Sequence, residues 1–367
     1  MSDSTKNTAV ELEPPSKAEY GQISGDVVTY GSLGLALAMA KETGIVDVLF
    51  EADTPLTSSG IAQKAGLKER YVREVLDTLT SARMLQLAPG TGGEDGEEAR
   101  YKLLPQHRDE FKKTAILTRM FSHSGRFFEQ IKQCFQPDTP SCVRYNDATF
   151  DMMDEMKADE TESRVQVLLK TPGLRQRLEK GIQMAEVGCG QARLSLAMAA
   201  MFPNSHFALT DVNAESLDRV RTAAQTKGLS NVTCEIVDVC KPPADWNARF
   251  DWLLACDVIH DLPHPQAALD GIFRSLRQGG HFSLSDYFAS SYVAKNVGNP
   301  EATVLYAMDI FFCIPESYQQ PDSEALGACW GKERILKMME KAGFQVVGIA
   351  RGEGWGTEGV MMCQKAA

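Results

Sequence analysis

The segment ACDVIHDLPHPQAAL carries two histidines four residues apart, His260 and His264. An imidazole gains or loses a proton near neutral pH, so a histidine that follows a predicted strand suits general-base chemistry. Asp286 ends another predicted strand, in HFSLSDYF, and could accept the second N–H of His260 and orient the ring. Both residues could instead cap a helix or bond the backbone, and we expect Asp261 to cap the helix that follows.

A second segment, AEVGCGQAR, places glycines where the backbone turns from a predicted strand into a predicted helix. Gly188 and Gly190 flank Cys189 and allow the backbone to turn sharply there. They also let the backbone approach a ligand closely, which a Cβ would prevent. Glu186 precedes the turn and can face a cationic group. A GxG pattern occurs in many turns, so this segment alone would also fit a pyrophosphate site.

Two further acids end the next two predicted strands. Asp211, in HFALTDVN, can accept hydrogen bonds from two ribose hydroxyls, and Asp238, in CEIVDVC, from an adenine amino group. Either acid alone could be a helix cap or a turn residue. With Glu186 and the glycines they predict a site for S-adenosylmethionine (SAM), because an NAD site has no place for Asp238 or for the closing AGF…GVMMCQK segment.

The composition excludes several classes of protein. The chain has 367 residues and a net charge of −11, which indicates one or two domains and argues against nucleic acid as a partner. The nine cysteines form no CxxC pair, so we expect neither a disulfide framework nor a metal site. No basic patch precedes an apolar segment near the first residue, and the longest apolar run is short; we therefore expect a cytoplasmic protein without a membrane partner.

The second half of the chain predicts an α/β fold, because strands alternate with helices. The predicted helices are Arg193–Met201, Ala214–Lys227, Pro265–Arg277 and Lys332–Ala342. The predicted strands are Gln183–Val187, His206–Asp211, Thr233–Asp238, Trp252–Cys256, His281–Asp286, Gln345–Ile349 and Gly359–Gln364. Such alternation gives a mostly parallel sheet with helices on both faces.

The first half predicts helices and one small wing. Residues 1–20 are polar and predicted to be disordered. Between Pro55 and Leu87 two short helices join at Gly66 as a helix-turn-helix, and Met84–Leu104 could form a β-wing. Helical spacing over Tyr30–Phe50 predicts one buried face, formed by Leu33, Leu37, Ala40, Ile45, Val48 and Leu49.

A winged helix raises the question of DNA binding. From Leu33 to Ala88 there are six basic and seven acidic residues, so this region lacks the excess of positive charge that DNA binding requires. We therefore predict that this region makes a homodimer and that the Leu33–Leu49 face packs against the partner subunit.

The chain resembles class I SAM-dependent methyltransferases that have an N-terminal winged-helix dimerisation domain. The resemblance covers about residues 30–367 and rests on VGCGQAR, LTDVN, IVDVC, FDWLLACDVIHDLPHP, LRQGG, LGACWGKE and KAGF. The architecture is similar to that of small-molecule O-methyltransferases of the caffeate and hydroxyindole type. The segments VIHDLPHP and LGACWGKE look closer to a poorly characterised group found in bacteria and animals.

This resemblance implies a Rossmann-like, seven-stranded sheet with its final hairpin reversed. It implies four parts of the chain: a tail (1–20), a winged-helix dimerisation domain (21–106), a helical linker and acceptor-pocket region (107–180) and a SAM-binding domain (181–367). The implied donor contacts are Glu186, Gly188, Cys189 and Gly190 at the methionine part, Asp211 and Val212 at the ribose, Asp238 and Val239 at the adenine, and Cys256 and Asp257 beside the donor.

Three functions remain open. The leading one is O-methylation of a small acceptor with His260 as base, since O-methyltransferases place their base in a similar His-Asp segment; their usual Trp after the Asp is Leu262 here. The others are N- or S-methylation by proximity alone, without a base, and SAM binding without turnover. Candidates for the acceptor pocket are Phe127, Tyr145, Phe150, Met153, Tyr287, Met308, Phe312 and Trp330.

Overall fold

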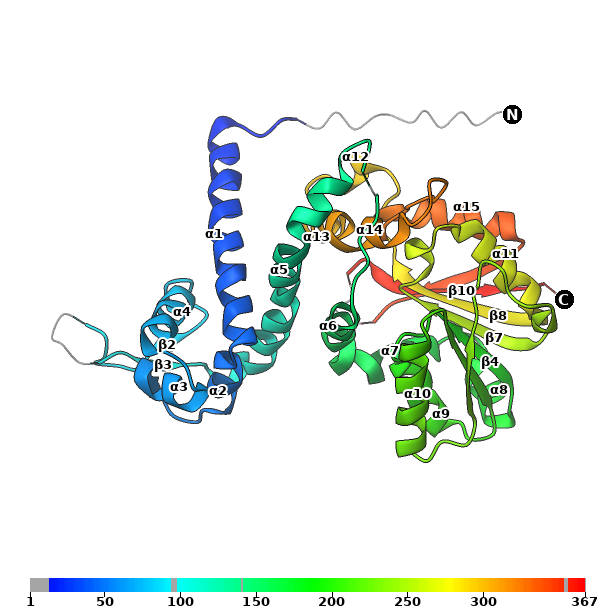
Figure 1. The fold of residues 1–367 in the computed structure, drawn as a ribbon, viewed down its shortest axis with the longest axis horizontal. Coiled ribbons are helices and arrows are strands. Elements are labelled where there is room, and N and C mark those ends of the chain that lie inside the picture. Colours follow the sequence, from blue (N-terminus) through cyan, green and yellow to red (C-terminus); the bar gives the residue numbers. More distant parts are fainter. Residues whose placement is uncertain (1–12, 94–97, 140, 353–355, 367) are drawn as a thin grey trace. The chain divides into compact units, whose positions relative to one another are not determined.

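The computed structural model describes residues 13–93, 98–139, 141–352 and 356–366. These residues form two compact units that divide between Phe127 and Phe128. Figure 1 labels the elements of both units. Each unit has a core of its own.

The first unit opens with α1 (Lys17–Glu42) and α2 (Ile45–Glu51), which are separated by Gly44 in the left-handed conformation at φ +79°. Helix α1 begins earlier than expected, because Ser16 and Glu19 form a reciprocal capping box. Residues 17–20 are therefore helical. Residues 1–12 of the expected tail lie outside the described residues.

The predicted winged helix is confirmed. Helices α3 (Ser58–Ala65) and α4 (Glu69–Ser81) join at Gly66, whose φ of +69° suits glycine, and Thr57 caps α3 by accepting a hydrogen bond from the Gly60 N–H. The strands pair in the order β1-β3-β2, and β2 and β3 form the wing. Their bounds are β1 Leu56–Thr57, β2 Gln86–Leu87 and β3 Arg100–Lys102.

The Leu33–Leu49 face is not available to a partner subunit, and that prediction was wrong. Leu37 and Leu49 are each 1 % exposed, in a cluster with Ile61 of α3 and Leu76 of α4. The face is apolar because it closes the core of its own unit. The apolar side chains that α1 leaves exposed are Tyr20, Ile23, Val27, Val28, Tyr30, Leu35 and Met39.

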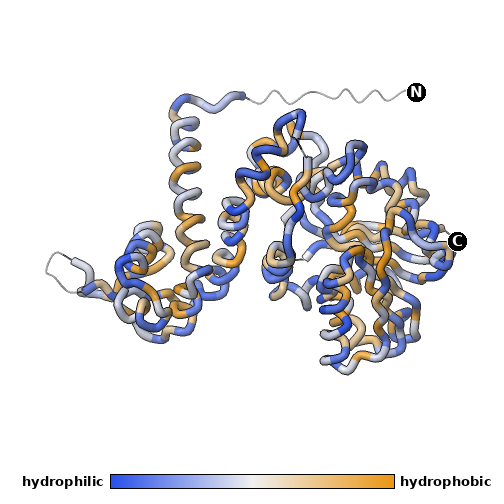
Figure 2. The backbone as a smooth tube through the Cα atoms, in the orientation of Figure 1, coloured by the Kyte–Doolittle hydropathy of each residue, from blue (hydrophilic) through white to orange (hydrophobic). Residues whose placement is uncertain are grey.

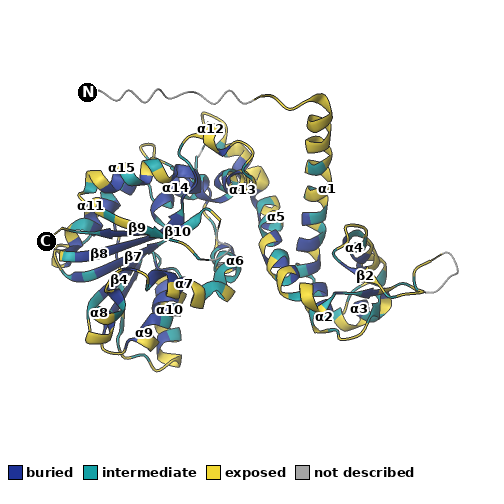
Figure 3. Ribbon diagram, turned by 180° about the vertical axis from the view of Figure 1, so that it is seen from behind, coloured by how far each residue is buried: buried dark blue, intermediate teal, exposed yellow. Residues whose placement is uncertain are grey.

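Helix α1 is unusually apolar for a helix that is so exposed. In the described part of the chain it alone is long and apolar enough to cross a membrane, with 22 % of its most apolar window buried. Figure 2 shows hydrophobic residues along this helix, and Figure 3 shows how much of it is exposed. Most of the large apolar side chains that the first unit exposes therefore lie on this helix.

The second unit contains the predicted seven-stranded sheet, in the order β6-β5-β4-β7-β8-β10-β9. Strands β4 to β8 are parallel, whereas β10 is antiparallel to β8 and to β9, so the reversed final hairpin is confirmed. The strands are β4 Gln183–Val187, β5 His206–Asp211, β6 Val232–Ile236, β7 Phe250–Cys256, β8 Leu276–Tyr287, β9 Gln345–Ala350 and β10 Glu358–Gln364.

Alternate residues of the strands build two layers of core. On one face, residues such as Leu253 and Phe282 pack against α11 (Pro265–Ser275) and α15 (Lys332–Ala342). On the other face, residues such as Phe207 and Trp252 pack against α7 to α10. Figure 1 shows these helix layers on opposite sides of the sheet, and Figure 3 shows the strands buried between them. The ranges of α7 to α10 are Thr161–Leu168, Leu174–Lys180, Arg193–Met201 and Ala214–Thr226.

The remaining elements are helical. After α5 (Arg108–Cys134) and α6 (Asp147–Lys157), an insertion between β8 and α15 contains α12 (Val293–Asn296), α13 (Pro300–Met308), a π-helical turn (η5) over Asp309–Cys313 and α14 (Ile314–Ser317). Short 3₁₀ turns are η1 Pro105–His107, η2 Ala158–Glu160, η3 Ala244–Trp246, η4 Ile259–Asp261 and η6 Ala328–Trp330. Both α14 and η6 contact η4, so the insertion covers the turn that carries His260.

Candidate active site

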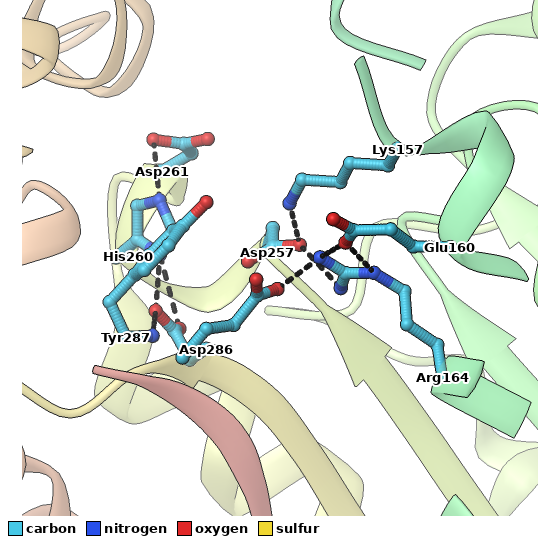
Figure 4. A network of polar contacts seen from close by, with 9 residues as sticks. Lys157, Glu160, Arg164, Asp257, His260, Asp261, Asp286 and Tyr287 are labelled. Atoms are coloured by element: carbon cyan, nitrogen blue, oxygen red, sulfur yellow. Dashed lines mark hydrogen bonds and ion pairs between the residues drawn. The ribbon is translucent and has the colours of Figure 1, made fainter. Parts of the chain in front are cut away.

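His260 and Asp286 meet at the carboxyl edge of the sheet. Strands β7 and β8 are parallel neighbours, so the η4 turn after β7 lies beside the end of β8. The Nδ1–H of His260 donates to Asp286, with distances of 3.0 Å to Oδ1 and 3.1 Å to Oδ2. His260 is 2 % exposed and Asp286 is fully buried. Figure 4 shows the imidazole between two carboxylates.

The second carboxylate belongs to Asp261, whose Oδ1 lies 3.5 Å from His260 Nε2. Burial lowers the pKa of His260, but Asp286 and Asp261 together outweigh burial and raise that pKa well above its usual value. The predicted role of Asp261 as a helix cap was wrong. Asp261 ends the η4 turn, and the N-cap residue of α11 is His264, which makes no side-chain hydrogen bond there.

Glu186 is buried in β4 at 4 % exposure, and its Oε2 accepts no hydrogen bond from the described residues. Burial raises the pKa of this carboxyl to about 7. A buried carboxylate with an oxygen that lacks a hydrogen bond is costly, and a cationic ligand would relieve that cost. Glu186 is therefore suited to a ligand that brings an ammonium group.

The loop after β4 needs both glycines. Gly188 has a φ of +58°, and a Cβ there would lie 2.3 Å from Cγ2 of Val258 in the loop after β7. Gly190 has a φ of +50°, and a Cβ there would meet only open space. Cys189 between them is buried. Gly188 thus packs one loop against the other, and Gly190 leaves room above the sheet for a ligand.

Asp211 and Asp238 lie at successive strand ends, but each also holds a turn. Asp211 accepts from the Gly190 N–H at 3.0 Å through Oδ2 and from the Asn213 N–H at 2.9 Å through Oδ1. Asp238 accepts from the Cys240 N–H at 2.9 Å. Strand β6 ends two residues before Asp238, so the predicted strand was too long there. A carboxylate has about four acceptor positions, so these bonds leave capacity for a ligand.

Four further predicted contacts surround this edge. Val239 is buried, whereas Val212 is 70 % exposed although it is aliphatic. Cys256 is half-buried at the end of β7, and Asp257 follows it at φ +50°, a conformation that strains a residue with a side chain. The predicted donor contacts therefore lie at the carboxyl ends of β4 to β7.

An ion-pair network that the sequence did not predict ties helices α6 and α7 to these strand ends. The Lys157 ammonium bonds Asp257 Oδ2, and Arg164 bonds Glu358 and, at 3.1 Å, Glu160. Figure 4 shows these charges grouped beside Asp257, with the His260 pair on its other side. No sequence pattern indicates these ion pairs, because Lys157 and Asp257 are 100 residues apart.

The charges of the network are firmly held. Burial raises the pKa of Asp257, but Lys157 and Arg164 outweigh burial and lower it. Burial lowers the pKa of Lys157, but Asp257 and other acids outweigh it and raise it. Arg164 has a side chain only 5 % exposed. The ionised forms of Lys157 and Asp257 are therefore favoured, and the network ties α6 and α7 to the edge of the site.

Of the proposed pocket residues in the second unit, Tyr287 lies near His260, with 6.5 Å between ring centroids, and 5.6 Å from the Lys157 ammonium. The Tyr145 hydroxyl donates to the Phe311 carbonyl at 2.5 Å. Trp330 is 1 % exposed within the core on the α11–α15 face of the sheet. Tyr287 therefore lines the site, whereas Trp330 packs in the core.

Two family models match the chain. A model described as a methyltransferase domain matches residues 178–343, and one described as an Rv2258c-like winged HTH domain matches residues 31–119. The curated ribosomal RNA small subunit methyltransferase C of Klebsiella pneumoniae subsp. pneumoniae is 29 % identical over 113 residues. That match covers 28 % of the chain and only 30 % of the relative's length, so it concerns one domain.

Solved structures match nearly the whole chain. Human N-acetylserotonin methyltransferase in complex with SAM has a TM-score of 0.69 at 14 % identity, covering 97 % of this chain and 100 % of that one. The mitomycin 7-O-methyltransferase MmcR has a TM-score of 0.68 at 15 % identity, and the match covers 95 % of this chain and 98 % of that one. At these identities the likeness establishes the fold.

Proposed function

We propose that this chain, a SAM-dependent methyltransferase with an N-terminal winged-helix domain, transfers the methyl group of SAM to a hydroxyl oxygen of a small molecule, with His260 as general base. The observation that supports this most is the buried His260–Asp286 pair, with 3.0 Å between Nδ1 and Oδ1. With Nδ1 held by Asp286, Nε2 is the atom that would accept the acceptor's proton.

The donor would lie across the loops after β4, β5 and β6. Glu186 would bind the ammonium of SAM, Asp211 the ribose hydroxyls and Asp238 the adenine amino group. The buried, unpartnered oxygen of Glu186 supports the first assignment. The exposed Val212 supports a ligand beside Asp211, because a bound adenosine would cover its aliphatic side chain.

The chemical step is an in-line displacement at the sulfonium methyl group. Its rate would depend on the alignment of donor and acceptor, to which the rigid ion pairs around Asp257 contribute by fixing α6 and α7. His260 would take the proton as the new C–O bond forms. An imidazolium cannot do so, so the neutral form of His260 is the active one. The positive sulfonium in the same crevice would lower the pKa of His260 toward that form.

A second candidate is transfer to nitrogen or sulfur without a base. The specific observation in its favour is that both ring nitrogens of His260 face carboxylates, which raise the pKa of the imidazole and so favour its cationic form. A neutral amine or a thioether need not lose a proton in the transition state. In that case His260 would only position the acceptor.

The experiment that tests the proposal is incubation of the purified protein with isotopically labelled SAM and a metabolite extract. Mass spectrometry then identifies the labelled products, and their structure shows whether oxygen, nitrogen or sulfur received the methyl group. The absence of any labelled product over diverse extracts, together with tight SAM binding, would favour a SAM-binding regulator instead.

We further propose that the protein is a homodimer built on α1. Seven large apolar side chains of this helix are exposed, and Val27 and Val28 are each 69 % exposed. A second copy of the same helix would cover such a surface by two-fold packing. The acceptor remains a small molecule in this proposal, without a nucleic-acid partner.

A further inference from the structure

His260 and Asp261 lie beside a thiol that the proposed transfer does not use. Cys313 ends the π-helical turn of the insertion and is buried at 7 % exposure. One ligand atom from each of His260, Asp261 and Cys313 lies within 4.8 Å of the other two. A π-helical turn is uncommon and often marks a functional site. Here it brings a thiol from the insertion to the turn after β7.

The spacing of these three atoms suits a metal ion. Zinc bonds of about 2.0–2.3 Å in a tetrahedral site place the ligand atoms roughly 3.3–3.8 Å apart. His260 Nε2 and Asp261 Oδ1 are 3.5 Å apart, and the Cys313 thiol lies within 4.8 Å of a ligand atom of each residue. One nitrogen, one carboxylate and one thiol are the donors that zinc prefers.

The surroundings of the histidine match a metal ligand as well. A histidine that binds zinc generally donates its other N–H to a carboxylate, which fixes the ring and makes the free nitrogen a stronger ligand. His260 donates Nδ1–H to Asp286 in this way and presents Nε2 to Asp261 and Cys313. The pairing that orients a base therefore also prepares a metal ligand.

Negative charge around the cluster exceeds positive charge. Asp261 Oδ1 is buried and accepts no hydrogen bond from the described residues. Glu316 of α14 places a further carboxyl near Asp261. The Asp309 carboxylate accepts hydrogen bonds from the Ala328 and Cys329 backbone N–H groups, so we do not count it among the metal ligands. A divalent cation would relieve this excess of negative charge. The Asp261 side chain is 29 % exposed, so an ion can reach the cluster from solvent.

We propose that His260 Nε2, the Asp261 carboxylate and Cys313 Sγ bind Zn²⁺, and that the bound ion inhibits methyl transfer. The Cys313 thiol and an imidazolium at His260 would each release a proton to solvent as the ion binds. Water would fill the fourth position. The ion takes the lone pair that the base needs. The inhibition therefore rests on the proposed function, whereas metal binding does not.

Cobalt titration of the full, tag-free chain tests the binding site. Co²⁺ is the spectroscopic probe, and we expect one equivalent to produce a thiolate-to-cobalt charge-transfer band that Zn²⁺ then removes. The Cys313→Ala variant should lose the band. The matched control Cys363→Ala removes a buried thiol from the sheet core and should keep it. No band in the wild-type chain, or a band that survives in Cys313→Ala, overturns the site.

Inhibition is measured separately, with an acceptor found as described above. We expect Zn²⁺ to suppress turnover of the wild-type chain, and Cys313→Ala to need at least tenfold more zinc. SAM affinity, measured by calorimetry, should stay the same with and without zinc. A wild-type chain that shows the cobalt band but turns over normally with zinc bound would refute His260 as base. Absence of the band would refute the metal site alone.

Discussion

The Nδ1 atom of His260 lies 3.0 Å from Oδ1 of Asp286, 26 residues away in the sequence, and solvent reaches almost none of either side chain. The carboxylate has a second task, because its Oδ1 also accepts from the Tyr287 N–H at 2.8 Å. The carboxylate is thereby fixed by the backbone at the end of β8, and it in turn fixes the imidazole. The first prediction follows from this pairing.

His260→Ala should lower turnover by roughly two to four orders of magnitude if the acceptor is a hydroxyl, since this is the usual contribution of a general base. Asp286→Asn should lower turnover less, because it only weakens the hydrogen bond that orients the His260 ring. The control is His264→Ala, which removes a partly exposed histidine of the same segment. Single-turnover rates at saturating SAM measure the effect, and a wild-type rate in His260→Ala would exclude the base.

SAM affinity should depend on pH through Glu186. Burial raises the pKa of this carboxyl to about 7 in the free chain, and the ammonium of SAM needs the ionised form. At pH 6 binding should therefore release about one proton, and the affinity there should be about fivefold lower than at about pH 7.5. Above pH 8 the affinity should fall again, because the amino group of SAM loses its own proton. Calorimetry in buffers of different ionisation enthalpy measures the released proton. In Glu186→Gln binding should be weaker and the proton release should disappear; proton release that persists would assign it to another group.

Asp211→Ala should weaken SAM binding by about 1–3 kcal/mol, because buried ribose hydroxyls would lose their acceptor. The same carboxylate also accepts from the Gly190 N–H, so the glycine loop should become more mobile as well. Asp218→Ala is the control, since Asp218 is an exposed acid on α10 that pairs with Arg221. Unchanged affinity in the Asp211 variant would remove this residue from the donor site.

Arg164→Met should lower the free energy of unfolding of the second unit by about 3 kcal/mol, because it leaves buried carboxylates without their cation. The Arg164 side chain is 5 % exposed and pairs with Glu358 and Glu160. Arg221→Met is the control, because the side chains of Arg221 and its partner Asp218 are 43 % and 72 % exposed. For this variant we expect a loss of about 0–1 kcal/mol in the free energy of unfolding. Urea unfolding followed by the fluorescence of the buried Trp246 and Trp252 measures both; equal losses would contradict a stabilising network.

Replacing Val27 and Val28 by Asp should convert the proposed dimer into a monomer, because two charges would enter an apolar interface. Helix α1 should still fold, since both side chains are 69 % exposed in the chain by itself. Light scattering at micromolar concentration gives the mass, and circular dichroism checks the helix content. A wild-type monomer would refute the dimer, and binding of the wild-type chain to lipid vesicles would point to a membrane partner instead.

The sequence by itself determined the local structure and its order. The alternation of strand segments with helical segments predicted a parallel sheet covered on both faces, and the glycines of AEVGCGQAR, which have φ +58° and +50°, marked the loop after β4. The acids at strand ends were predicted because the carboxyl ends of parallel strands must share one edge. The same rule predicted that His260 and Asp286 lie close together. These features depend on residues that are close in sequence or on a general property of parallel sheets.

Only the tertiary structure decided which surfaces and charges meet. The apolar face over Leu33–Leu49 has the same pattern whether it packs against its own unit or against another chain, and packing within the unit fills it. Lys157, Arg164 and Cys313 reach the site from α6, α7 and a π-helical turn, far from the residues they meet. Their partners are set by how helices settle over the sheet, which is a long-range packing outcome without a local periodicity to reveal it.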